Sequence, residues 1–189
     1  RVLFRSTGLY LTTDEFYRML EQLYANDYVL VDAETMADLT EDTFITEVNL
    51  TVPVGKKPLI LVLDTFDYNA AATYNYGLCT QLALDEQGYI CGQYVAPDGT
   101  LVSGRELEAI GILDKFVEDH PDFSFDGAKG VISICGYESV FGYVISRDEA
   151  DDRSEALASI GRPNVTFSDA EIEANRQTVS EITSVLLDT

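Results

Sequence analysis

Several residue types that build common functional sites are rare or absent in this sequence. It has no tryptophan and a single histidine, His120, in 189 residues. A histidine-rich zinc site is therefore excluded, and a Ser-His-Asp hydrolase is disfavoured because no Gly-x-Ser-x-Gly sequence is present. The three cysteines, Cys79, Cys91 and Cys135, lack Cys-x-x-Cys spacing, which excludes a cysteine zinc framework. A disulfide between Cys79 and Cys91 across a hairpin stays open, although the odd third thiol argues against a disulfide scaffold.

Basic residues are also scarce. The chain has 12 lysines and arginines against 33 aspartates and glutamates, which gives a formal net charge of −21. Phosphate backbones and anionic membrane surfaces would repel such a chain, so we expect no nucleic-acid partner. No apolar run approaches the roughly 18 to 20 residues of a membrane-spanning helix, so we expect no such segment. Strong acidity suits an extracellular or cell-envelope protein, although we recognise no signal peptide.

The two ends of the chain look unlike those of a natural gene product. Residues 1–6, RVLFRS, resemble a translated sequencing adaptor, and we exclude them from the fold prediction. Residues 7–189 predict one α/β domain, and the whole chain has the 46% hydrophobic content of an ordinary globular protein. A predicted helix runs up to Thr189 with nothing after it to pack against. We therefore expect the domain to be truncated at its carboxyl end.

Helical and strand patterns alternate along the chain, as is typical of an α/β fold. Thr12 and Glu15 have the spacing of a capping box at the start of a helix, and Ser168 and Glu171 repeat it near the carboxyl end. The other predicted elements outside the centre are a strand over 28–31, a short helix over 34–39 and a helix over 105–120.

Residues 78–103 have a different pattern. Three short apolar runs over 78–84, 89–95 and 100–102 are separated by the turn sequences DEQG and PDG, whose glycines suit positive φ. This pattern predicts an antiparallel β-meander inserted into the α/β domain.

The stretch PLILVLDTFDYN places an unbroken apolar run before two carboxylates. The run over 59–63 predicts a strand buried on both faces, as in parallel sheets, with Asp64 and Asp67 at its carboxyl end. A second strand, predicted over 129–135, leads into Gly136 and Tyr137. Chemical groups in parallel α/β folds project from such strand ends. The simpler alternative is that both aspartates are turn residues.

Three segments together resemble the polysaccharide deacetylase family, in particular a branch found in gut Firmicutes. They are TTDEFYRMLEQLYANDYVLVDAETMA, GKKPLILVLDTFDYN and LDKFVEDHPDFSFDGAKGVISICGYESVFGY. The resemblance implies a distorted (β/α) barrel, here partial and interrupted by the meander. It further implies a hydrolase of carbon–nitrogen bonds other than peptides, which removes acetyl groups from N-acetylated sugars of cell-wall or related glycans with a divalent metal, most often zinc.

The resemblance also assigns roles at the end of the central strand. The family's first motif ends in two aspartates, one the general base and the next a metal ligand. Asp64 takes the base position, and Thr65, a poor ligand, stands at the metal position. A register shifted by three residues would instead make Asp67 the base and would place Tyr68, which does not match the family's aspartate, at the metal position. We prefer Asp64, because Tyr68 then matches a tyrosine that is usual in the branch.

The family's histidine motif is missing from this chain. His120 lies before a proline at a predicted helix end, where a surface position is expected. We therefore expect zinc in the parent protein, none bound by this chain, and no activity of the chain alone.

Two other functions stay open. The first is a catalytically inactive relative that binds glycan at the cell envelope, with the rings of Tyr68 and Tyr137 stacking on sugars. The second is a purely structural domain in which the strand-end aspartates only cap turns.

Overall fold

The computed structural model describes residues 11–33, 37–39, 45–47, 50–64, 66, 68–76, 79–134 and 136–188. The helices are α1 (Thr13–Ala25), α2 (Ala70–Tyr76), α3 (Ala109–Asp119), α4 (Arg147–Ser159) and α5 (Asp169–Asp188), with short 3-10 helices η2 (Arg105–Leu107) and η3 (Pro121–Phe123). The strands are β1 (Tyr28–Leu30), β2 (Ala37–Leu39), β3 (Ile45–Glu47), β4 (Lys57–Leu59), β5 (Val62–Leu63), β6 (Gln81–Leu84), β7 (Ile90–Val95), β8 (Leu101–Gly104) and β9 (Val131–Ile132).

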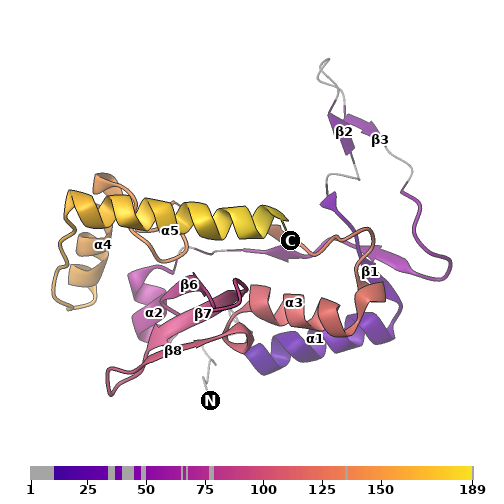
Figure 1. The fold of residues 1–189 in the computed structure, drawn as a ribbon, viewed down its shortest axis with the longest axis horizontal. Helices are drawn as coiled ribbons and strands as arrows, with labels where there is room; N and C mark the ends of the chain where they lie inside the picture. The colour runs from indigo at the N-terminus through magenta and orange to yellow at the C-terminus, as the bar shows by residue number, and fades with distance from the viewer. Residues whose placement is uncertain are drawn as a thin grey trace.

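The predicted mixed α/β class is confirmed. The described strands form four small sheets, none of them closed: the parallel pairs β1–β4 and β5–β9, the antiparallel pair β2–β3, and the antiparallel sheet β6–β7–β8. Helices α1 and α3 pack side by side, as do α2 and α4 (Figure 1).

Helix α1 begins as its sequence predicts. The Thr12 hydroxyl accepts a hydrogen bond from the Glu15 N–H at 3.1 Å, and the Glu15 carboxylate accepts one from the Thr12 N–H at 2.9 Å. This capping box satisfies backbone donors that the first helical turn leaves free. Phe16 and Leu20 are the buried residues of the helix, which ends at Asn26.

The central apolar run is one extended segment with two successive partners. The Val31 N–H donates to the Leu59 carbonyl, the Val131 N–H to Leu61 and the Ser133 N–H to Leu63. Peptide groups two residues apart in a strand point to the same side. Strands β1 and β9 therefore lie end to end along one side of residues 57–63. Among the described residues, no strand pairs with the opposite side.

The prediction that this run is buried on both faces is wrong. Leu59, Leu61 and Leu63 face α1 and α3 and are partly buried. Ile60 and Val62 point to the other face and are exposed, with 56% of Val62 accessible. The run is uniformly apolar, but only one of its faces is covered by helices.

Two other predicted elements have different outcomes. The meander over 78–103 is confirmed as β6–β7–β8, and the Asp85 carboxylate accepts hydrogen bonds from the N–H groups of Gln87 and Tyr89 in its first turn. The short helix predicted over 34–39 is wrong where it can be compared, because residues 37–39 form β2; residues 34–36 lie outside the described part. Helix α4 was not predicted at all.

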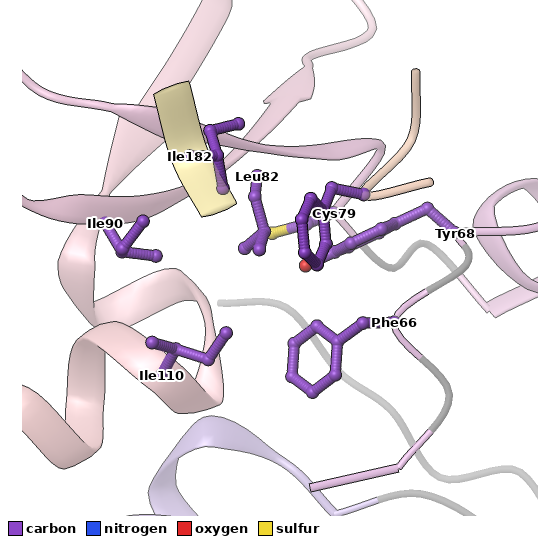
Figure 2. Packing of buried hydrophobic residues seen from close by; sticks show 8 residues of the cluster. Phe66, Tyr68, Cys79, Leu82, Ile90, Ile110 and Ile182 are labelled. Carbon is purple, nitrogen blue, oxygen red and sulfur yellow. The ribbon is translucent and has the colours of Figure 1, made fainter. Parts of the chain in front are cut away.

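Within the described part of the chain, two hydrophobic clusters form the core. One lies between α1, α3, η3 and the covered face of the strand segment; its buried members are Phe16, Leu20, Leu30, Ile112, Leu113, Phe116 and Phe123. The other joins the meander, α3, α5 and the chain after β5; its buried members are Phe66, Tyr68, Cys79, Leu82, Ile90, Ile110, Phe141 and Ile182. Figure 2 shows the second cluster, in which Ile182 of α5 approaches Leu82 of β6.

Candidate functional site

The candidate site lies at the carboxyl ends of β5 and β9. These strands are parallel neighbours, so the segments that follow them leave from the same edge. Asp64 follows β5 directly and is exposed, while Tyr137, five residues after β9, is 50% exposed. Thr65 and Asp67 lie outside the described residues. The two segments that leave this edge thus carry an exposed carboxylate, Asp64, and a half-exposed aromatic ring, Tyr137.

Tyr68 is placed differently from Tyr137. Only 6% of it is exposed, its ring packs against Phe66 in the second core cluster, and its hydroxyl donates to the Glu108 carboxylate at 2.8 Å. Burial and the neighbouring Glu108 raise the pKa of Tyr68 well above its usual value. Its ring face is occupied by protein, so it is not open to a sugar in this structure.

Glu108 is a buried acid that the sequence did not single out. Its carboxylate accepts hydrogen bonds from the Tyr68 hydroxyl and from the Ala109 N–H at the start of α3, both at 2.8 Å. The residue is partly exposed as a whole, but its carboxylate lies in the interior, and this desolvation raises its pKa. Its position just after a 3-10 helix gives no sequence signal of burial.

The cysteines beside this pair are reduced. Cys79 and Cys91 are both buried free thiols, so the disulfide that the sequence left open is absent. The Cys79 thiol donates to the Leu107 carbonyl at 3.4 Å, and burial raises its pKa to about 12. A thiol with that pKa stays protonated at neutral pH and is a poor nucleophile. Cys135 lies outside the described residues.

A buried polar cluster joins the two segments that form the edge. Glu138 is 2% exposed, and its carboxylate accepts a hydrogen bond from the Ala70 N–H at 2.8 Å. Arg153 of α4 lies 3.5 Å from that carboxylate and donates to the Tyr68 carbonyl at 3.2 Å and the Ser139 hydroxyl at 2.7 Å. One guanidinium group therefore contacts the segments after both β5 and β9.

The surroundings of Tyr137 are acidic. Partial desolvation and then the negative charges of Glu138, Asp152 and Glu155 raise the pKa of the Tyr137 hydroxyl. Such an edge repels anionic ligands and suits neutral or cationic ones. A neutral N-acetylated sugar is compatible with this field.

The described residues do not fit a complete zinc site. They contain no group of three or more His, Cys, Asp or Glu side chains that could hold a metal ion. His120 ends α3, where its ring stacks on Phe116 with the centroids 4.4 Å apart. It also packs against Tyr24 of α1, beside the Lys56–Asp122 ion pair. This cluster lies near the amino end of β4, whereas Asp64 lies beyond the carboxyl end of β5. The helix-end position predicted for His120 is confirmed, but its ring is partly buried rather than on the open surface.

Comparison with family models, with curated proteins and with solved structures found no significant match. Within the described part of the chain, no helix combines the length and apolar character needed to cross a membrane.

Proposed function

We propose that this chain is part of a metal-dependent polysaccharide deacetylase of distorted (β/α)-barrel type, which hydrolyses N-acetyl groups of cell-wall or related glycans. The observation that carries the proposal is the position of Asp64. It stands exposed at the carboxyl end of a parallel strand, and the neighbouring parallel strand leads into the segment that carries Tyr137. The resemblance of the surrounding sequence supplies the reaction class.

In this proposal the chain's own residues bind the sugar and move a proton. An exposed carboxylate such as Asp64 can accept the proton of a water molecule that attacks an acetyl carbonyl, a step that typically contributes 10²- to 10⁴-fold. Asp67 is the second choice for this role. Tyr137 offers a half-exposed ring face for stacking on a sugar.

The metal part of the proposal depends on residues other than the described ones. Asp64 alone cannot hold zinc, and His120 lies at the opposite end of the strand segment. We therefore expect the 189-residue chain to bind acetylated glycan without hydrolysing it. A catalytically inactive glycan-binding relative is the second candidate, favoured by Thr65 at the position that the resemblance assigns to a metal ligand.

The first test is isothermal titration of the chain with a hexamer of N-acetylglucosamine and with the glucose hexamer, which lacks acetamido groups. We expect the acetylated glycan to bind at least about tenfold more tightly. Asp64→Asn and Tyr137→Ala should each weaken its binding. Tyr89→Ala, which removes a similarly exposed tyrosine from the meander, should not. Equal binding of both sugars contradicts the deacetylase, and binding of neither sugar contradicts both glycan functions.

A second arm separates the deacetylase from the inactive binder. If Thr65 stands at the metal position, Thr65→Asp places a second carboxylate next to Asp64 and should raise zinc affinity about tenfold or more, measured by competition with a chromophoric chelator. Thr100→Asp, in a meander turn, is the control for added charge. An equal effect of the two substitutions would rule out the proposed metal position.

A further inference from the structure

Arg153 makes a contact pattern that the proposed reaction does not use. Its guanidinium carries donors in a planar fork, which can contact two segments at once. One nitrogen donates to the Tyr68 carbonyl and the other to the Ser139 hydroxyl, while the third nitrogen faces Glu138. Helix α4, from which it comes, lies against α2. We call Glu138, Ser139 and Arg153 the clamp.

The segments held by the clamp have unfavourable backbone conformations. Tyr68 has a φ of 49° and Glu138 a φ of 65°, both in the left-handed region that residues other than glycine rarely adopt. Such conformations persist only where the surrounding structure holds them. At Tyr68 the carbonyl is bonded to Arg153, and at Glu138 the carboxylate is bonded to Ala70. The clamp therefore contacts the chain at both positions.

The clamp is also enclosed. Glu138 and Ser139 are fully buried, and the Arg153 side chain is largely buried beside them. Removing the cation from a buried ion pair is strongly destabilising, so loss of Arg153 would favour movement of the Glu138 carboxylate toward water. Because Glu138 also accepts from the Ala70 N–H, that movement would release the start of α2.

We infer that Arg153 and Glu138 are positioning residues of the candidate site. They hold the segment after β5, with Asp64, against the segment after β9, with Tyr137, so that one glycan can contact both. The inference rests on the proposed function for its ligand, but the joining of the two segments can be tested without any ligand.

The experiment compares Arg153→Met with Arg147→Met. Arg147 begins the same helix and makes an exposed ion pair with Asp169, so its substitution removes the same charge without touching the clamp. Hydrogen exchange of the Ala70 amide tests whether the segments after β5 and β9 are still joined. Exchange at Leu82 and Ile90 tests whether the hydrophobic core is intact. Titration with the N-acetylglucosamine hexamer measures glycan affinity at the candidate site. We expect Arg153→Met to lose protection at Ala70 only and to weaken glycan binding about tenfold or more. Arg147→Met should change neither.

A protected Ala70 amide and unchanged glycan affinity in Arg153→Met would overturn the inference. If the wild type binds no acetylated glycan, the proposed function fails by itself. The clamp is then tested by hydrogen exchange of the Ala70 amide in Arg153→Met: loss of protection supports the clamp, and retained protection overturns it. Should Arg153→Met fail to fold, Arg153→Lys and Ser139→Ala replace it. Arg153→Lys keeps the charge but replaces the planar fork of donors with a single ammonium group. Full wild-type protection and affinity in both replacements would therefore also overturn the inference.

Discussion

At the scale of single residues, the site neighbourhood is marked by acids that the fold encloses. Glu108 is the clearest example of the free-energy cost of burying a carboxylate. Its carboxylate lies in the interior and accepts hydrogen bonds from the Tyr68 hydroxyl and the Ala109 N–H. These donors favour the charged form and lower its pKa, but desolvation is the larger effect and raises it. The folded state therefore disfavours the ionised form of Glu108.

This balance predicts a pH dependence for Glu108→Gln. A raised folded pKa means that the acid's contribution to stability is fully present below its ordinary pKa of 4.5 and is lost as pH rises through the folded value. Glutamine stays neutral and keeps an acceptor oxygen. We expect the free energy of unfolding of Glu108→Gln to improve relative to wild type as pH rises from about 4.5, measured by urea denaturation. Glu106→Gln, an exposed neighbour, is the control; an equal trend there would contradict the prediction.

At the scale of elements, helix-capping residues predicted the local structure more fully than the apolar runs predicted burial. The capping residues Thr12 and Ser168 make the bonds that their spacing predicts, since these bonds lie within one turn. The run over 59–63 predicted the extended segment but not its exposure. An apolar sequence does not say which neighbours will cover it, because that depends on contacts distant in the chain.

The buried side chains of the candidate site could not be predicted for the same reason. Asp64 could be proposed because it follows a strand run directly. Arg153 lies in a strongly polar helix whose sequence has no apolar stripe by which to predict it. Its partners Tyr68 and Ser139 are 85 and 14 residues away in the chain. Glu138 follows a predicted strand end, but its burial results from the same long-range contacts.

The two faces of the strand segment should respond very differently to truncation. Leu63 packs against both core clusters, whereas Val62, its neighbour, is mostly exposed. We expect Leu63→Ala to lower the free energy of unfolding by about 2–3 kcal/mol, through lost apolar contact and a residual cavity. Val62→Ala should change it by no more than about 0.5 kcal/mol. Chemical denaturation of both variants measures the difference, and similar losses would mean that the second face is also covered in solution.

At the scale of the whole molecule, an apolar face coexists with a large negative charge. Ile60, Val62 and Val131 are exposed on one face of the paired strands, next to a strand side that no described strand covers. Parallel strands are ordinarily buried on both faces, and open edges invite pairing with other chains. The net charge of −21 opposes self-association at neutral pH.

These opposing effects predict that self-association depends on pH. Near the isoelectric point of about 4.1 the repulsion disappears, and the wild type should form larger particles, detected by light scattering, while remaining monomeric at neutral pH. Val62→Lys should suppress this association, because a charged lysine on the open apolar face makes burial of that face against another chain unfavourable. Val95→Lys changes net charge identically at a meander valine of nearly equal exposure, 58% against 56%. It should therefore leave the association intact. If the two lysine variants behave alike, net charge alone controls association, and the open face of the parallel strands has no part in it.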